Sequence, residues 1–272
     1  MKLLLNCVLA IVCCLPAFAF AQTAEELVAK NIQAKGGMDK IKAIKTLRLS
    51  GKFQQDIFTA KTGEEAKAPD KLREMFTIQG MTAIQAYDGT TGWQISPFQG
   101  RKDPELLGED DLRDIVEDAD FYGPLVDYQE KGNSIAYLGH DAIDGDDVYR
   151  LKVTLKNDDI IYYYLDPDTY LEIRTDKQQF IRGAVKETVT DLGSYKLVDG
   201  VYYPFSIESG PKNHPEAKSK VTISSIEANV PINDADFQMP AAPATPSPQK
   251  HAEPPAKSKP PKPAPAKPPA QQ

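Results

Sequence analysis

The densest group of residues that could do chemistry is a run of carboxylates near the middle of the chain, between residues 109 and 120. Paired carboxylates can hydrolyse glycosidic bonds, and clustered ones can bind Ca²⁺. The run consists of Glu109, Asp110, Asp111, Asp114, Glu117, Asp118 and Asp120. Apolar residues interleave with it at helical spacing, at Leu112, Ile115, Val116 and Ala119. We therefore favour an amphipathic helix with a solvated acidic face over a hydrolase or a calcium site.

The remaining polar groups offer weaker chemistry. A second acidic group, Asp141, Asp144, Asp146 and Asp147, lacks the spacing of an EF-hand loop, and Gly145 within it favours a hairpin turn. Between residues 22 and 240 the only histidines are His140 and His214, and neither lies in a zinc motif such as H-E-x-x-H. No nucleophile elbow, P-loop or Rossmann glycine pattern is present. We expect a protein that is not an enzyme, with no catalytic residues, metal or cofactor.

Composition excludes several classes of protein. The 272 residues carry a net charge of −7, from 32 basic and 39 acidic side chains, and 41% are hydrophobic. These values are ordinary for a globular protein and exclude a polytopic membrane protein and a wholly disordered chain. The acidic balance argues against nucleic acid as a partner, because such binders need a basic face for phosphates.

The first 21 residues have the pattern of a secretory signal peptide. Lys2 is followed by an apolar run from Leu3 to Leu15 and by the small-residue pattern Ala19-Phe20-Ala21. An uncleaved membrane anchor is the less favoured alternative, because the run is short for a membrane span. All three cysteines, Cys7, Cys13 and Cys14, lie in this segment, so the mature protein is expected to be periplasmic and free of disulfides.

Residues 241–272 are rich in Pro, Ala and Lys. Proline fixes φ and lacks a backbone donor, so this segment is predicted to be a disordered, extended tail. It contains five lysines and one glutamate. A solvated spacer is the favoured interpretation. The alternative is a tail that contacts an envelope protein, a membrane surface or peptidoglycan.

The segment between these ends is predicted to be mainly β with a few helices. Thr23 and Glu26 form a capping-box pattern for a helix that ends at Gly36-Gly37. Residues 104–128 have the features of one or two further helices. Alternation of apolar and polar residues indicates about eleven strands. These are 46–58, 71–79, 82–87, 92–97, 134–138, 148–155, 160–165, 169–180, 184–195, 201–208 and 218–228.

Short turns between consecutive strands imply an antiparallel meander, and a sheet this wide must curl. We expect a large curved antiparallel sheet, an unclosed half barrel of about eleven strands. The N-terminal and central helices would cover its apolar concave face.

Such a face can bind an apolar ligand, and strand parity selects candidate lining residues. These are Leu47, Leu49, Phe53, Phe76, Ile78, Ile84, Trp93, Ile95, Leu151, Val153, Tyr162, Tyr164 and Ile173. Arg48 and Arg73 are candidates for contact with a polar head group.

Several segments, in order, resemble outer-membrane lipoprotein-sorting proteins of the Lol type. They are "AEELVAKNIQAKGGMDKIKAIKTLRLSGKF", "APDKLREMF", "AIQAYDGTTGWQISP", "YYYLDPDTYLEIRT", "LVDGVYYPFSIE" and "NVPINDADFQMP". The resemblance spans about residues 24–240 and implies an unclosed barrel with a helical lid over an apolar cavity. In that family the cavity receives lipoprotein acyl chains or other hydrophobic ligands.

The resemblance therefore predicts a domain over residues 22–240 that binds acyl chains in the periplasm. The carrier of that family is usually shorter and has no long Pro-Lys tail, and the lipid-modified cysteine of the family's membrane-anchored receptor is missing. The alternative function is an envelope interaction or scaffold protein that acts through its Pro-Lys tail.

Overall fold

The computed structural model describes residues 22–100 and 102–241. The predicted signal peptide, with its three cysteines, and residues 242–272 of the predicted tail lie outside the described residues. Within the described ranges, no helix is both long enough and apolar enough to span a membrane.

The N-terminal helix, α1 (Ala24–Lys35), begins with the predicted capping box. The Glu26 backbone N–H donates to Thr23 Oγ1, and the Thr23 N–H donates to the Glu26 carboxylate, both at 3.2 Å. The helix ends at Gly36, where φ is 134° and an added Cβ would lie 2.3 Å from the Gly200 carbonyl oxygen. Only glycine fits this position, which directs the chain into α2 (Met38–Ala43).

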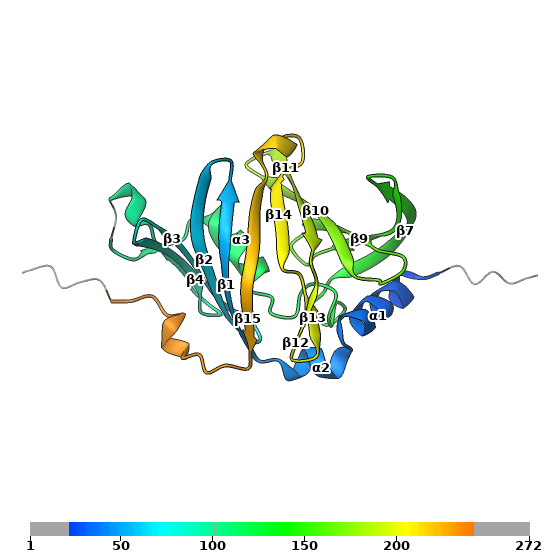
Figure 1. The fold of residues 1–272 in the computed structure, drawn as a ribbon, viewed down its shortest axis with the longest axis horizontal. Helices are drawn as coiled ribbons and strands as arrows, with labels where there is room; N and C mark the ends of the chain where they lie inside the picture. Colours follow the sequence, from blue (N-terminus) through cyan, green and yellow to red (C-terminus); the bar gives the residue numbers. More distant parts are fainter. Residues whose placement is uncertain (1–21, 101, 242–272) are drawn as a thin grey trace, which may run out of the picture. The chain divides into compact units, whose positions relative to one another are not determined.

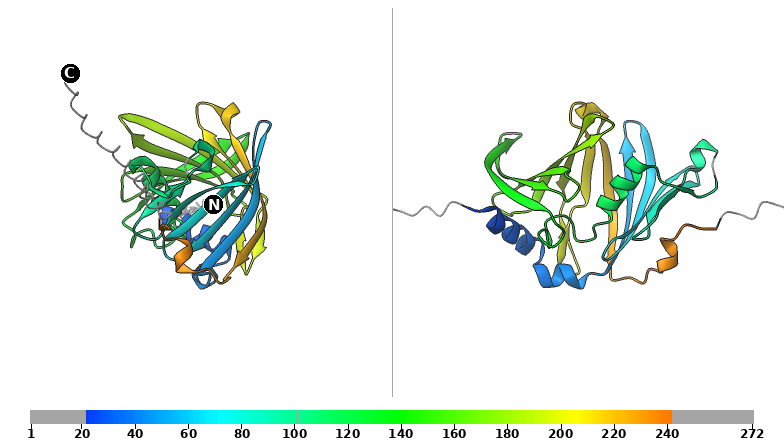
Figure 2. Two further views of the ribbon diagram at one scale, coloured as in Figure 1. Left: turned by 90° about the vertical axis from the view of Figure 1, so that its left-hand side faces the viewer. Right: turned by 180° about the vertical axis from the view of Figure 1, so that it is seen from behind.

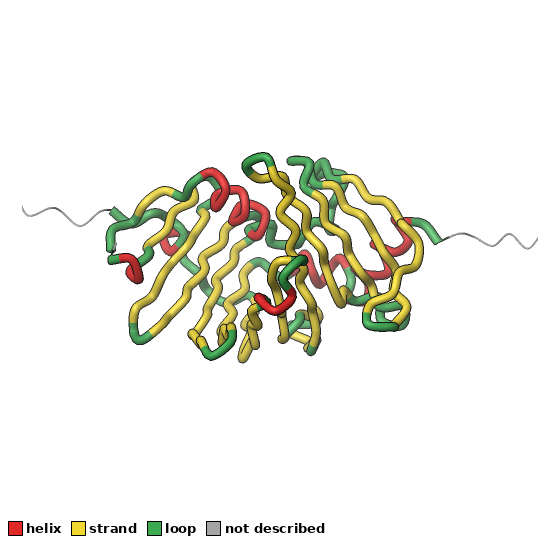
Figure 3. The backbone as a smooth tube through the Cα atoms, turned by 90° about the horizontal axis from the view of Figure 1, so that it is seen from above, coloured by secondary structure: helices red, strands yellow, loops and turns green. Residues whose placement is uncertain are grey.

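Thirteen strands of the described chain form one antiparallel sheet, in the order β6-β5-β4-β3-β2-β1-β15-β14-β11-β10-β9-β8-β7. Their bounds are β1 Thr46–Gln55, β2 Phe58–Lys67, β3 Lys71–Ile78, β4 Met81–Tyr87, β5 Gly92–Ile95, β6 Glu105–Leu106, β7 Ser134–Ile143, β8 Asp146–Thr154, β9 Ile160–Leu165, β10 Glu172–Ile181, β11 Ala184–Gly193, β14 Ser206–Pro211 and β15 Ser219–Ala228. The end strands β6 and β7 do not pair with each other, so the sheet is not closed. Figure 3 shows the strands as one curved band.

The remaining elements lie between these strands. β12 (Lys196–Val198) and β13 (Val201–Tyr203) form a two-stranded sheet, and α3 (Glu109–Asp118) lies between β6 and β7. Three short 3-10 helices are η1 (Pro97–Gln99), η2 (Pro215–Ala217) and η3 (Asp234–Asp236). The unclosed antiparallel sheet with a central helical insertion confirms the predicted fold class.

The number of strands differs from the prediction, with fifteen in the described residues against about eleven. β2 has no apolar alternation because two of its inward positions are Thr62 and Glu64. The predicted strand 201–208 is interrupted at Pro204-Phe205, because proline cannot donate to a ladder, and it becomes β13 and β14. β6 and β12 have two and three residues, too few to show a period.

The helices pack on one face of the sheet, which we call the interior face (Figures 1 and 2). Leu27 and Val28 of α1 pack with Leu151, Val153 and Leu165 of β8 and β9. In the other half of the sheet, residues of α2 and α3 pack with Leu47, Ala66 and Leu72 of β1, β2 and β3. Two apolar cores thus anchor the helices to the interior face.

The C-terminal segment, residues 229–241, lies against the opposite, outer face of β2 to β5. Trp93 Nε1 donates to the Phe237 carbonyl oxygen at 2.7 Å, and both side chains are almost fully buried. Asp234 Oδ1 forms ion pairs with Lys67 Nζ and Lys71 Nζ, at 3.0 and 2.8 Å, respectively. This segment therefore covers apolar side chains that point away from the helices.

Candidate functional site

Cross-strand pairing arranges the interior face of β1 to β5 into successive rows of side chains. The row under the helices is apolar. It contains Leu47, Ala66, Leu72 and Tyr87, which lie opposite one another on β1 to β4 and pack with Leu112 and Ile115 of α3. This row belongs to the buried core and positions the rows beside it.

The next row is polar. Glu64 of β2 lies opposite Glu74 of β3, followed by Gln85 of β4 and Gln94 of β5. We call these four residues the polar row. Gln94 donates to the Glu105 carboxylate at 3.1 Å. Glu64 and Glu74, in contrast, have no hydrogen bond or ion pair with any described residue.

Beyond the polar row, four phenylalanines gather at the open end of the interior face. We call Phe53, Phe58, Phe76 and Phe98 the phenylalanine rim. The Phe76 ring centroid lies 5.0, 6.1 and 6.5 Å from those of Phe53, Phe58 and Phe98, respectively. Phe58 and Phe98 are each 39% exposed, so this aromatic surface is open to solvent. Exposed clusters of this kind mark sites for apolar ligands or partners.

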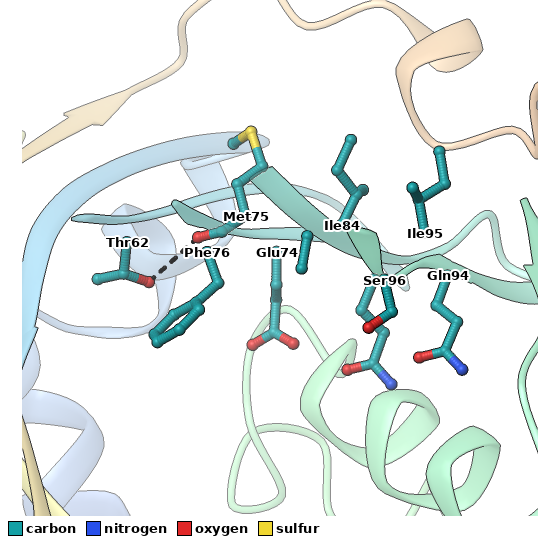
Figure 4. Close-up of a pocket in the computed structure, with 10 residues that line it drawn as sticks. Thr62, Glu74, Met75, Phe76, Ile84, Gln94, Ile95 and Ser96 are labelled. Carbon is teal, nitrogen blue, oxygen red and sulfur yellow. Dashed lines mark hydrogen bonds between the residues drawn. The ribbon is translucent and has the colours of Figure 1, made fainter. Parts of the chain in front are cut away.

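A pocket of about 250 Å³ joins the polar row to the phenylalanine rim. Glu74, Gln85 and Gln94 line it together with Phe76, Thr62 and Ser96. Figure 4 shows the Glu74, Phe76, Gln94 and Ser96 side chains pointing to one side of the strands, and Met75, Ile84 and Ile95 pointing to the other. The pocket therefore offers a carboxyl, amides and a hydroxyl beside an aromatic ring.

A larger cavity of about 1200 Å³ lies between α3, the loop that follows it and the interior face of β9, β10, β11 and β14. Its sheet side is lined by Ile161, Tyr163, Thr175, Lys177, Gln179, Lys186, Thr188, Thr190 and Ser209. Most of these side chains are polar. The predicted apolar concave face is therefore restricted to the two cores and the phenylalanine rim, because β10 and β11 turn lysine and threonine inward.

Ion pairs join α3 to the far half of the sheet across this cavity. Lys177 of β10 lies 2.5 Å from Glu117 and 3.7 Å from Asp114. Asp114 also accepts hydrogen bonds from Gln179, at 2.7 Å, and from Lys186, at 3.3 Å. Burial opposes ionisation of Asp114, but Gln179, Lys177 and Lys186 hold the pKa of its carboxyl below the usual value. Arg113 adds an ion pair to Asp159, at 2.9 Å from Nε.

The carboxyls of the polar row resist ionisation. Burial, reinforced by the negative charge of Asp118, raises the pKa of Glu64 to about 7. Burial together with Glu64 and Asp118 raises the pKa of Glu74 to about 8. Asp118 itself is exposed to the cavity, yet the protein around that cavity restricts its hydration and raises the pKa of its carboxyl. The interior face therefore carries a group of acids in a poorly hydrated environment.

Seven of the thirteen predicted lining residues do lie on the interior face. Leu47, Leu151 and Val153 are buried in the cores. Leu49 packs at the edge of a core, while Phe53 and Phe76 belong to the phenylalanine rim. Ile78 follows Phe76 on the same face of β3. These residues come together because period two holds along β1, β3 and β8.

Five predicted lining residues lie on the outer face, so their expected inward orientation is wrong. Ile84, Trp93 and Ile95 share that face with Arg73, and the C-terminal segment buries Trp93 there. Tyr162 and Tyr164 also point outward, whereas Tyr163 between them points inward. Three consecutive tyrosines give no sign of which parity faces inward. Ile173 lies at a bulge between Glu172 and Arg174 and has no cross-strand partner in the register.

Both predicted head-group residues also lie on the outer face. Arg48 Nε and Arg73 Nη1 each pair with the buried Glu65 carboxylate, at 2.9 and 3.1 Å. Their positions are opposite in parity to Leu47 and Leu72, and so they point away from the interior. The ligand-binding role of every predicted residue stays a prediction.

The acidic run forms the predicted amphipathic helix, with Ile115 and Ala119 buried. Its Asp114, Glu117 and Asp118 face the large cavity, however, and the first two are ion-paired, so the acidic face is not simply solvated. His140 and His214 are exposed and pair with Asp147 and Glu216, at 2.7 and 3.1 Å. No group of three metal-ligating side chains occurs within the described ranges.

Sequence reasoning missed the polar row and the inward lysine and threonines of β10 and β11. The available signal was the position of Glu64 and Glu74, each on the inward parity of its strand. Glu74 alternates with Leu72 and Phe76, both apolar, and a rule that places polar residues on the outer face cannot identify it.

No family model and no curated protein sequence matches this chain. Its fold is nevertheless similar to those of solved structures. A DUF1329 family protein from Desulfovibrio piger superposes with a TM-score of 0.57 at 13% identity, covering 80% of this chain and 98% of that one. A putative outer membrane lipoprotein-sorting protein domain from Vibrio parahaemolyticus gives 0.55 at 11% identity, covering 79% and 95%.

A LolA superfamily protein from Nitrosomonas europaea gives a TM-score of 0.55 at 13% identity, covering 80% of this chain and 98% of that one. At these identities the likeness shows a common fold. The resemblance to lipoprotein-sorting proteins that the sequence motifs predict is thereby confirmed at the level of the fold.

Proposed function

We propose that this protein is a non-enzymatic carrier that binds a hydrophobic ligand on the interior face of its unclosed sheet. The observation that carries the proposal is the phenylalanine rim, an aromatic surface left open to solvent beside the cavities of that face. Folding normally buries such side chains, and their exposure costs free energy unless another molecule covers them.

The ligand class we favour is the acyl chain of a lipoprotein or of another lipid. Each methylene that moves from water onto an apolar surface contributes about 0.8 kcal/mol. The end strands β6 and β7 do not pair, so the sheet does not close around the ligand. The fold shared with a lipoprotein-sorting domain and a LolA superfamily protein supports this choice.

We place the carrier in the periplasm because residues 1–21 have the pattern of a signal peptide. A role in the sorting of outer-membrane lipoproteins belongs to the same proposal. The predicted Pro-Lys tail remains an alternative site for an envelope partner, and deletion of residues 241–272 would separate the two functions. Ligand binding should survive that deletion, whereas tail-dependent partner binding should not.

The proposal is tested with a neutral apolar reporter, N-phenyl-1-naphthylamine, whose fluorescence rises on binding. The exported chain, residues 22–272, should bind it. Because Phe53 and Phe76 form the centre of the rim, Phe53→Ala and Phe76→Ala should weaken binding at least about tenfold, or about 1.4 kcal/mol.

Phe180→Ala is the matched control, because Phe180 is 65% exposed on the outer face of β10. That variant should bind as tightly as the wild type. If the reporter does not bind, or if all three substitutions have the same effect, the interior face is not the binding site.

A further inference from the structure

Glu64 and Glu74 are two carboxyls placed side by side with no cation to neutralise them. They lie directly opposite each other in the register of β2 and β3, both on the interior face. Both side chains are half-buried, and Glu74 lines the pocket between the polar row and the phenylalanine rim. Neither side chain has a hydrogen-bond or ion-pair partner among the described residues, whereas the neighbouring Glu65 on the outer face pairs with both Arg48 and Arg73.

The lysines that β10 and β11 turn toward the large cavity are already ion-paired. Lys177 pairs with Glu117 and Asp114, and Lys186 pairs with Asp114. Asp118 adds a third negative group on the facing helix. An unpaired, poorly hydrated carboxyl is costly to a folded protein, and proteins normally pair such groups. Its presence in an open pocket indicates that the partner is a ligand.

The pocket beside Glu74 supplies the other contacts that an ammonium group needs. Thr62 and Ser96 offer hydroxyl oxygens, and Gln85 and Gln94 offer amide oxygens that can accept its hydrogen bonds. The Phe76 ring lines the same pocket and can interact with a cation through its face. Phe76 is also the centre of the phenylalanine rim, so an apolar surface begins where the pocket ends.

We propose that this pocket binds the ammonium head group of an amphipathic ligand, with Glu74 and Glu64 as its counter-charges and the phenylalanine rim as the surface for its apolar chain. This inference rests on the proposed carrier function and specifies that the ligand is positively charged. The ligand is then a cationic lipid or another long-chain amine, and fatty acids of the same length are poor ligands.

The test compares three probes that share a ten-carbon chain and differ in charge: decylammonium, decanoate and decanol. Each is titrated against the bound naphthylamine reporter in the chain of residues 22–272, below its micelle concentration. Decylammonium should displace the reporter at a concentration at least tenfold lower than decanoate, with decanol in between. For each probe, the measured quantity is the concentration that displaces half of the reporter. In Glu74→Gln and Glu64→Gln, the ratio of the decanol value to the decylammonium value should fall at least fivefold, while the decanol value stays unchanged.

Glu227→Gln is the matched control, because Glu227 is an exposed strand glutamate on the outer face of β15. It removes the same charge from the molecule without touching the pocket and should leave the preference unchanged. An equal loss in Glu227→Gln would mean that the net negative charge of the protein, and not the pocket, attracts the amine.

The outcomes separate this inference from the proposed function. If all three probes displace the reporter equally, or if the preference survives both interior glutamine substitutions, the ammonium site is refuted while the apolar site stands. If no probe and no reporter binds, the carrier function itself is refuted. Circular dichroism of each variant verifies that it is folded.

Discussion

At the scale of single residues, ionisation of the Glu64 and Glu74 carboxyls in the polar row changes the free energy of unfolding. The Glu64 and Glu74 carboxyls have raised pKa values in the folded protein, about 7 and about 8, against an ordinary value of 4.5. The folded state therefore holds these protons more tightly than the unfolded chain does. Their contribution to stability is fully present below about pH 4.5 and is lost as the pH rises through 7 to 8.

We predict that the free energy of unfolding falls between pH 5 and pH 9, and that Glu64→Gln and Glu74→Gln reduce this fall. Because both side chains are only half-buried, solvent weakens the effect of burial, and we expect each substitution to recover on the order of 2 kcal/mol at pH 9. Asp118, Asp114, Lys177 and Lys186 line the large cavity and remain ionisable in these variants. Urea unfolding at pH 5, 7 and 9 measures the effect.

The control for this experiment is again Glu227→Gln, which should follow the pH profile of the wild type. A wild-type stability that is flat or rising over this range would show that the two carboxyls ionise normally. The same conclusion would follow if the interior and exterior substitutions gave equal profiles.

At the scale of elements, α3 is held by two different kinds of contact. Its apolar side packs on the row under the helices, where Ile115 is 2% exposed. Its acidic side is paired with β10 and β11 across the large cavity. The helix thus bridges two parts of the sheet that are distant in strand order, and it forms one wall of the cavity.

We predict that Ile115→Ala costs about 2–5 kcal/mol of stability, because it leaves a void in a packed core. The adjacent Val116 is 42% exposed, and Val116→Ala should cost less than about 1 kcal/mol. Thermal or urea unfolding of the two variants measures the difference. Equal costs would contradict the placement of Ile115 against the sheet.

The C-terminal segment is a second element whose role can be measured, because Trp93 is the only tryptophan in the chain. Phe237 is fully buried over the outer face of β5, so Phe237→Ala should cost about 3–5 kcal/mol. It should also shift Trp93 fluorescence to longer wavelength, because water reaches the indole.

Met239→Ala is the matched control in the same segment, since Met239 is 36% exposed. It should change neither stability nor emission. An unchanged Trp93 emission in Phe237→Ala would show that the segment does not shield the outer face.

At the scale of the whole molecule, the fold was predictable from periodicity and turn residues, because both are local. The alternation of Leu47, Leu49 and Phe53 correctly predicted β1 and its inward face. Alternation could not predict which side chains of β5 point inward. Trp93 and Ile95 alternate equally well, and their outward direction depends on the C-terminal segment, in which the Trp93 partner Phe237 lies 144 residues further along the chain.

The site was less predictable for a related reason. An inward polar residue breaks the alternation of apolar and polar residues by which a strand is predicted. Glu64 is such a residue, so neither β2 nor the polar row could be predicted from that alternation. The phenylalanine rim draws its members from β1, β2, β3 and η1, and only cross-strand register brings them together. Sequence parity identified Phe53 and Phe76 but could not show that Phe58 and Phe98 join them.

We propose that this chain carries a hydrophobic ligand, and native mass spectrometry can detect that ligand on the protein. Residues 22–272 would be purified from a bacterial periplasm without detergent, and the mass of the intact protein would be measured. We predict an additional mass that organic extraction removes and identifies as a lipid. A clean mass of the protein alone, in a sample that also takes up no added naphthylamine, decanol or decylammonium, would contradict it.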